Sequence, residues 1–213
     1  MGLAQSIRTL IVEIDGYLAP LDGPAIADVR AGLARWGQGP VNLLAAQPEP
    51  AFGFLDTAIA AIEARPALQH AIAQSLPYLR WITYDLYPRQ EIGPRFPQAH
   101  AFCSLIGETG SVPADDYEIG LFLMAPHTLY RDHHHPAPEL YAPLTGPHRW
   151  RFGAGASWIE KRAHEIVWNE PWQVHATAVG PTPFLCIFGW TRDVNLPAKV
   201  VPAADWNVIE ASL

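Results

Sequence analysis

The sequence has little cysteine, little charge and no cluster of positive residues, and each shortage narrows the class of protein. Only Cys103 and Cys186 occur among 213 residues, and they form no C-x-x-C pair. This argues against a disulfide framework and fits a reducing compartment. Charged residues make up 16% of the chain and the formal net charge is -7. A nucleic-acid partner and an anionic membrane surface are both disfavoured, because both require clustered positive charge.

Long apolar runs are also missing. No stretch approaches the roughly 20 apolar residues that span a bilayer. The N-terminus carries Glu13 and Asp15 where a secretory signal would need a basic region. We therefore expect a cytoplasmic protein without a membrane span. Hydrophobic residues make up 49% of the chain, which is enough to build a buried core in one domain with an appended helical segment.

The first third of the chain, residues 1–79, has the pattern of helices. Between residues 25 and 36, apolar residues recur at spacings of three and four and define one helical face. A longer stripe of the same kind runs from Phe52 to about Leu79, and Pro66 inside it should kink or split the helix. We expect these apolar faces to pack against the rest of the protein.

Residues 80–213 have a different character, with short segments rich in aromatic and β-branched residues that Gly or Pro separates. The expected strands cover residues 81–84, 119–124, 156–159, 165–168, 174–179 and 184–190. Many short strands without an intervening helical pattern favour an antiparallel sandwich or barrel. The predicted class is α+β, mainly β: a β-barrel with a helical segment packed beside it.

A histidine-rich segment, Tyr130 to Leu144, is the most informative part of the sequence. Residues two apart on a strand point to the same face, so His133 and His135 can reach one ion while His134 points away. Pro136 and Pro138 indicate a turn, after which Glu139 adds a carboxylate oxygen from the next strand. Nitrogen and oxygen donors of this kind suit a divalent first-row metal.

A fourth ligand must come from a distant part of the chain, and His175 is the best candidate because it stands where a turn enters an apolar strand. Three histidines and one glutamate leave one or two positions open, as a catalytic ion requires. We expect one divalent ion, held by His133, His135, Glu139 and His175. These ligands accept zinc, iron, manganese or nickel, so the identity of the metal stays open.

Two tyrosines accompany the predicted ligands. Tyr141 lies two residues after Glu139 and should face the same interior, where a nearby cation would lower the pKa of its phenol toward that of a usable base. Tyr130 is a second candidate, either to position a substrate or to act as an alternative base. Aromatic residues that can line a cage for a cation are Tyr117, Trp150, Trp158, Trp168, Trp172, Phe188 and Trp190.

The spacing His133-x-His135-x-x-x-Glu139, followed by Gly146, resembles the first cupin motif, and the Pro-containing turn before His175 resembles the second. The usual glycine ahead of the first motif and the Pro-x-Gly of the second are missing, so the match is at the ligands and not at the turns. The resemblance implies a cupin barrel, also called a double-stranded β-helix or jelly roll, preceded by N-terminal helices.

The extended pattern, which adds Tyr130, Tyr141, Pro143 and Leu144, is narrower than cupins at large. It resembles the cupin-type dimethylsulfoniopropionate (DMSP) lyases, which also have a helical segment before the barrel. The detailed match covers roughly residues 117–192. That family includes relatives that do not cleave this substrate, so the resemblance implies the site more firmly than the substrate.

The resemblance implies a metal-dependent carbon–sulfur lyase that cleaves DMSP, a zwitterionic sulfonium carboxylate, to dimethyl sulfide and acrylate by β-elimination. Tyr141 is the expected base. Two alternatives of other classes remain: a cupin oxygenase acting on a small carboxylate, and a non-catalytic cupin that binds a small molecule. Oxygen uptake would identify the first, and binding without product the second. A homodimer is a further expectation, because barrel edges and exposed aromatic residues favour isologous contacts.

Overall fold

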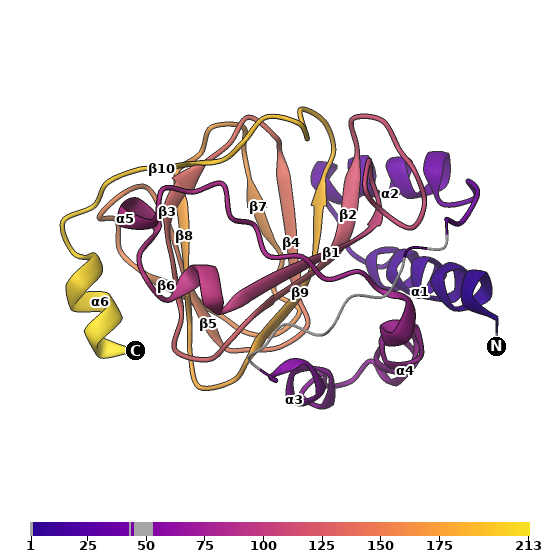
Figure 1. Cartoon of the computed structure of the whole chain (residues 1–213), viewed down its shortest axis with the longest axis horizontal. Coiled ribbons are helices and arrows are strands. Elements are labelled where there is room, and N and C mark those ends of the chain that lie inside the picture. Colours follow the sequence, from indigo (N-terminus) through magenta and orange to yellow (C-terminus); the bar gives the residue numbers. More distant parts are fainter. Residues whose placement is uncertain (1, 43, 45–52) are drawn as a thin grey trace.

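A computed structural model describes residues 2–42, 44 and 53–213 of the chain. Most of the helix lies in the first eighty residues, and one helix ends the chain at the opposite side of the molecule (Figure 1). The helices are α1 (Leu3–Leu18), α2 (Pro24–Trp36), α3 (Leu55–Ala60), α4 (Pro66–Ser75), η1 (Leu76–Tyr78), α5 (Arg89–Ile92), η2 (Phe96–Gln98) and α6 (Trp206–Ser212). In the described part of the chain, none of them is long and apolar enough to cross a membrane.

In the part of the chain that the structure describes, ten strands form two antiparallel sheets that face each other. The strands are β1 (His100–Ile106), β2 (Glu118–Met124), β3 (Leu129–His134), β4 (Glu139–Pro143), β5 (His148–Phe152), β6 (Ile159–Lys161), β7 (Val167–Asn169), β8 (His175–Val179), β9 (Phe184–Trp190) and β10 (Lys199–Val200). One sheet has the order β1-β2-β9-β4-β7 and the other β10-β3-β8-β5-β6. The two sheets form the β-barrel that the sequence predicts.

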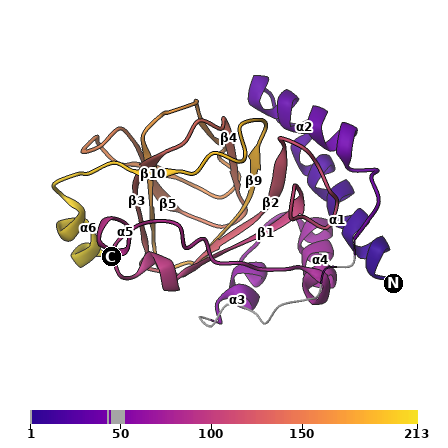
Figure 2. The ribbon, with the colours of Figure 1, turned by 45° about the horizontal axis from the view of Figure 1, so that its top comes forward.

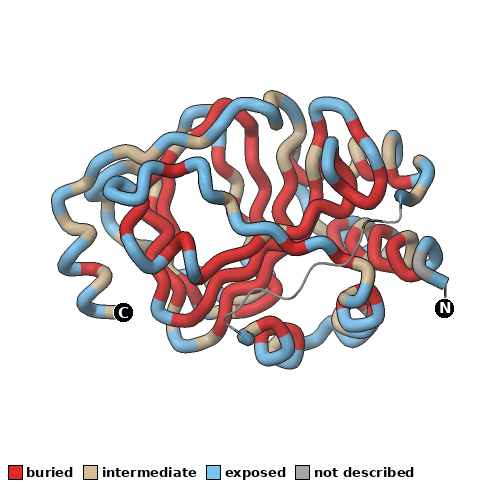
Figure 3. The backbone as a smooth tube through the Cα atoms, viewed as in Figure 1, coloured by how far each residue is buried: buried red, intermediate tan, exposed pale blue. Residues whose placement is uncertain are grey.

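Helices α1 to α4 cover the outer face of the first sheet (Figure 2). Helix α1 packs against α4 and α2, α2 contacts β4, and α3 contacts β9. The apolar side chains of these helices join the outward-facing residues of the sheet, such as Ile119 and Ile187, in one core. A second core lies inside the barrel and is mainly aromatic, with Phe122, Trp150 and Phe184 fully buried. The buried residues accordingly lie along the strands, through the centre of the molecule (Figure 3).

The helical predictions are largely confirmed. Residues 25–36 lie in α2, and the longer stripe is divided, because Pro66 begins α4. Proline is favoured in the first turn of a helix, where its missing N–H needs no partner. Phe52 lies outside the described residues. Helix α1 was not predicted individually, although its buried Leu10 and Ile14 show the same periodicity. The division into two units at residue 79 stays a prediction.

The predicted strands are confirmed at 119–124, 174–179 and 184–190, which coincide with β2, β8 and β9 within a residue. Residues 81–84 were wrongly predicted as a strand, because they form only an isolated bridge from Ile82 to Phe102. Their aromatic side chains pack instead, with Trp81 in the helical core. The segments 156–159 and 165–168 overlap β6 and β7 only partly, and β1, β5 and β10 were not predicted.

Candidate metal centre

Three histidines meet inside the barrel from two neighbouring strands. His133 lies on β3, His135 follows that strand directly, and His175 begins β8 opposite His133 in the sheet. All three are buried, and ligand nitrogens from the three rings lie within 4.8 Å of one another. His134, between the first two, points elsewhere and packs edge-on against Trp172. Because side chains alternate along a strand, His133 and His135 point into the barrel and His134 points away from it, as predicted.

The orientation of each imidazole is set by a backbone carbonyl. The Nδ1 atoms of His133, His135 and His175 lie 2.8 Å from the carbonyl oxygens of Arg131, Ala137 and Gln173. A carbonyl oxygen can only accept, so each Nδ1 carries the proton and donates it. In a neutral ring, the Nε2 atom then presents a lone pair to the centre of the cluster. This is the arrangement by which metal-ligating histidines are oriented.

Two of these three nitrogens have no hydrogen-bond partner among the described residues. The Nε2 atoms of His133 and His175 are buried and lack a hydrogen bond among the described residues. Burial, together with the neighbouring His175 and His135, lowers the pKa of His133 well below its ordinary value, so that this ring is neutral at physiological pH. Orphaned buried acceptors are costly unless something fills the space between them, and a cation suits them.

The Glu139 carboxylate, at the start of β4, lies beside two of the three imidazoles. Its Oε2 lies 3.1 Å from Nε2 of His135 and 3.3 Å from Nε2 of His175. Two acceptors so close require a proton or a metal ion between them. Burial alone would raise the pKa of Glu139, but the facing imidazoles outweigh it and hold that pKa well below the ordinary value. Three imidazoles and a carboxylate fit a divalent transition metal.

Both oxygens of Glu139 are also held from the side. Asn169 donates to Oε2 at 3.0 Å and the indole nitrogen of Trp190 donates to Oε1 at 2.7 Å. These residues face Glu139 across the sheet, Asn169 from β7 and Trp190 from β9. Hydrogen bonds to an ionised carboxylate are among the stronger ones, so Glu139 is fixed in position.

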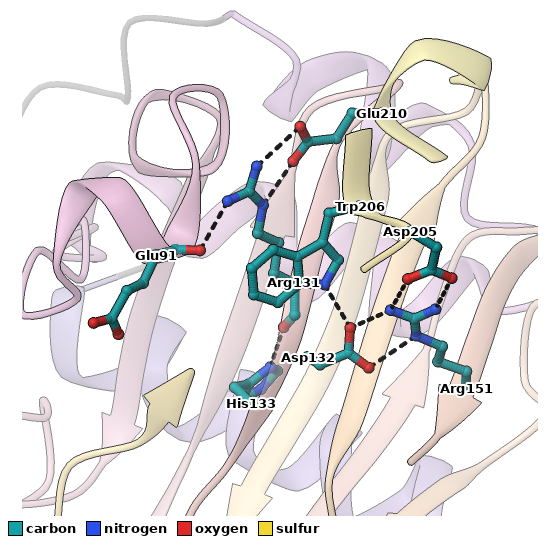
Figure 4. Close-up of polar contacts among 8 residues, drawn as sticks. All are labelled: Glu91, Arg131, Asp132, His133, Arg151, Asp205, Trp206 and Glu210. Atoms are coloured by element: carbon teal, nitrogen blue, oxygen red, sulfur yellow. Dashed lines mark hydrogen bonds and ion pairs between the residues drawn. The ribbon is translucent and has the colours of Figure 1, made fainter. Parts of the chain in front are cut away.

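Strand β3 is clamped on its outer side (Figure 4). The guanidinium of Arg131, whose carbonyl orients His133, donates to both oxygens of Glu210 in α6 and to the carbonyl of Glu91 in α5. Next to it, the buried Asp132 pairs with Arg151 and accepts a hydrogen bond from the indole of Trp206. The clamp anchors α6 and fixes the backbone that carries two of the histidines.

A pocket of about 470 Å³ opens from the centre, within the range of sites for small molecules. Aromatic side chains are the largest group in its lining, and the other polar side chains are His135, Glu139, Glu108, Glu118, Thr109 and Asn195. The aromatic lining consists of Tyr84, Tyr87, Phe102, Tyr130, Tyr141, Phe188 and Trp190. None of the described residues that line the pocket is a lysine or an arginine.

Both predicted tyrosines lie at the inner end of this pocket. Tyr141 is two residues beyond Glu139 on β4. Tyr130 stacks on His133, with 3.8 Å between the centroids of the two rings. Burial, followed by the negative charge of Glu139, raises the pKa of Tyr141 well above its usual range. Burial and the neighbouring Tyr87 and Tyr141 do the same for the pKa of Tyr130. Without a cation, both phenols are therefore protonated.

With this geometry established, comparison with known proteins decides the family. The sequence model of the dimethylsulfoniopropionate lyase family matches residues 37–186. The chain belongs to this family. A comparison with curated protein sequences gives no significant match.

Two solved DMSP lyase structures resemble the whole chain. A chain from work on the DMSP lyases RdDddP and RnDddQII is 17% identical, with a TM-score of 0.74, over 94% of this chain and 100% of the other. DMSP lyase DddQ from Ruegeria pomeroyi DSS-3 is 21% identical, with a TM-score of 0.67, over 92% and 96%. At these identities the likeness concerns the fold, and the cupin barrel with N-terminal helices is confirmed.

Within this lyase fold, only two of the aromatic residues proposed for a cage line the pocket, Phe188 and Trp190. Tyr117 was wrongly proposed, because it is buried in the helical core and donates to the carbonyl of Val29. Trp150 belongs to the barrel core, and Trp172 is largely exposed. Trp158 packs on the guanidinium of Arg151, and Trp168 packs toward the helical core.

Sequence reasoning missed two residues of the site. Tyr87 comes from the segment before α5, and its hydroxyl lies 2.7 Å from that of Tyr130. Asn169 holds Glu139 from β7. Neither stands in a recognisable motif, because each reaches the site through a sheet pairing or a packing contact across a long stretch of chain.

Proposed function

We propose that the protein is a metal-dependent carbon–sulfur lyase that cleaves DMSP to dimethyl sulfide and acrylate by β-elimination. One observation carries the proposal: three histidine nitrogens converge, the Glu139 carboxylate lies beside two of them, and His135 and Glu139 line an aromatic pocket. Membership of the DMSP lyase family supports the substrate.

His133, His135, His175 and Glu139 would hold one divalent ion. When bound, such an ion takes up a carboxylate at an open position, stabilises negative charge that develops beside it, and lowers the pKa of a neighbouring phenol. The three carbonyls that accept from Nδ1 keep the imidazoles in the ligating tautomer. Trp190 and Asn169 keep the Glu139 carboxylate in place.

Tyr141 is the proposed base. Its phenolate oxygen takes the proton from the carbon next to the substrate carboxylate. The electron pair of that C–H bond forms the double bond of acrylate, and the pair of the breaking C–S bond leaves with sulfur as neutral dimethyl sulfide. Because the leaving group starts as a cation, it needs no general acid. Tyr130, stacked on His133, positions the substrate or serves as the alternative base.

The aromatic walls suit the other end of such a substrate. Faces of Trp, Tyr and Phe attract onium cations through their quadrupoles, and Trp190 and Phe188 lie beside Glu139 and Tyr141 on the pocket floor. A sulfonium group can therefore be held without a hydrogen-bond donor, which it could not use.

The test is to incubate the metal-loaded protein with DMSP and measure headspace dimethyl sulfide together with acrylate. We expect equal amounts of both products, no oxygen uptake, and loss of product after chelation of the metal. Oxygen consumption during turnover would show that the protein is an oxygenase and not a lyase. Tight binding of DMSP without product would show that the protein is a binding protein and not a lyase. A homodimer in solution stays a prediction for gel filtration with light scattering.

A further inference from the structure

The charges of the pocket are distributed unevenly along its length. The buried His135 and Glu139 line the pocket beside the candidate metal centre, whereas the other lining carboxylates, Glu118 and Glu108, are more exposed to solvent. No lysine or arginine among the described residues lines the pocket to balance these carboxylates. A ligand carboxylate therefore has no cationic side chain to bind, while a ligand cation has two carboxylates available away from the centre.

Sheet register places Glu118 in a row with the candidate metal centre. Glu118 on β2 pairs with Trp190 on β9, and Trp190 pairs with Glu139 on β4. Directly paired residues project on the same face of a sheet, so all three side chains lie on the pocket floor. Adjacent strands are about 4.8 Å apart, which puts the backbones of Glu118 and Glu139 roughly 10 Å apart with the indole of Trp190 between them.

The neighbouring row again has an aromatic ring of β9 in the middle, with the proposed base on one side and a glycine on the other. Gly120 on β2 pairs with Phe188 on β9, which pairs with Tyr141 on β4. A Cβ atom at Gly120 would lie 1.9 Å from the carbonyl oxygen of Cys103 and 3.0 Å from the ring of Phe188. The floor therefore runs from the proposed base and metal ligands, across two aromatic rings of β9, to the Glu118 carboxylate.

Glu118 itself has no cationic partner. It is partly buried and accepts a hydrogen bond from the hydroxyl of Ser104, and none of the described residues forms an ion pair with it. Burial raises the pKa of Glu118, against the effect of Ser104 and together with the nearby negative charge of Glu108. A desolvated carboxylate without a counter-charge costs free energy, and a cation in the pocket would remove that cost.

We propose that Glu118 determines specificity for a positively charged group on the substrate. The onium group lies over the aromatic rings of β9 and faces the Glu118 carboxylate, while the substrate carboxylate points to the histidine cluster. The substrate class is a zwitterion with its two charges separated by a short chain such as two methylene groups. Such a molecule is shorter than the roughly 10 Å that separates the backbones of Glu118 and Glu139. The inference rests on the proposed function, whose carboxylate orientation it uses.

The experiment compares two ligands of the same shape on Zn²⁺-loaded protein by isothermal titration calorimetry. One is 3-(trimethylammonio)propanoate, a zwitterionic analogue of the proposed substrate with a poor leaving group. The other is 4,4-dimethylpentanoate, an isostere in which an uncharged tert-butyl group replaces the ammonium group and only the carboxylate charge remains. We expect the protein to bind the zwitterion about tenfold or more tightly than the isostere, as a partly desolvated ion pair predicts. Glu118→Gln should lower that ratio severalfold by weakening chiefly the zwitterion, while the aromatic rings of β9 keep the remainder of the preference.

Two control variants separate charge from structure. Glu118→Asp keeps the negative charge and should retain part of the preference. Glu108→Gln removes an exposed carboxylate at the mouth of the same pocket, and should leave the ratio almost unchanged because water screens that charge. If Glu118 only supported Ser104, Glu118→Gln would weaken both ligands equally. That result, or an unchanged ratio, would overturn the inference.

Failure of this inference differs from failure of the proposed function. If the unmodified protein releases dimethyl sulfide from DMSP but Glu118→Gln retains the full preference for the onium ligand, the inference alone is wrong. If no dimethyl sulfide is released, the lyase proposal fails. The ligand ratio then still reports whether Glu118 selects a cation.

Discussion

Trp190 donates its indole hydrogen to Oε1 of Glu139 at 2.7 Å, and this contact joins the wall of the pocket to the candidate metal centre. On the opposite side, Asn169 donates to Oε2 of the same carboxylate. Glu139 is buried between these two donors and the imidazoles. Its position is therefore set by residues of three strands rather than by β4 alone.

The first prediction concerns this support. Asn169→Ala removes one donor without touching the pocket lining, so Glu139 should lose part of its orientation. We expect metal affinity to fall by about 10- to 100-fold, the usual effect of losing an outer partner of a ligand. Titration with Zn²⁺ against a competing chelator measures it. Trp190→Phe, which removes the other donor, should act in the same direction, and unchanged affinity in both variants would contradict the prediction.

The predicted ligands should contribute unequally to metal binding. His135→Ala and His175→Ala each remove one of three converging nitrogens, and we expect the purified variants to have lost the single divalent ion. Glu139→Ala should weaken binding less, because the imidazoles remain. Elemental analysis of the purified proteins decides the matter. His134→Ala, which changes the ring that packs on Trp172, is the matched control and should keep the metal.

Tyr141 separates a lyase from a barrel that merely binds a metal. Tyr141→Phe removes the phenolic oxygen and keeps the ring that packs near Trp150 and Phe122. Turnover should fall by about two to four powers of ten, the range for losing a positioned general base. Metal content, fold and substrate affinity should change little. If the variant turned over at a near-normal rate, Tyr141 would not be the base. Either Tyr130 would then have that role, or DMSP would not be the substrate.

Acid should destabilise the fold through His100, which is fully buried. Its Nδ1 donates to the carbonyl of Phe96 and its Nε2 accepts from the N–H of Tyr84, so the ring is neutral. Burial lowers the pKa of His100 from 6.5 to about 4. The folded state therefore binds fewer protons than the unfolded state between these two values.

The free energy of unfolding should accordingly be at its full value above pH 6.5 and decrease as the pH falls toward 4. A shift of this size corresponds to about 3 kcal/mol for one group. Urea denaturation across this pH range measures the effect. In His100→Gln the titrating group is absent, so its acid-dependent share should disappear, and an unchanged pH dependence in that variant would refute the assignment to His100.

Local spacing already determined a large part of the candidate site. Side chains alternate along a strand, so residues 133 and 135 share a face and residues 139 and 141 share the next one. In the structure all four side chains are buried, and those of His135 and Glu139 are in contact. The apolar periodicity before residue 79 likewise predicted helix, since the pattern of a buried face needs no information from distant residues.

Tertiary structure alone decided which distant residues complete the site. Asn169 and Trp190 reach Glu139, and Glu118 reaches the same floor, through pairings between strands that are far apart in the chain. Tyr87 reaches Tyr130 by packing. A shift of one residue in any of these registers would turn the side chain to the other face of the sheet. No local pattern encodes that register, because it follows from how the two sheets close around their aromatic core.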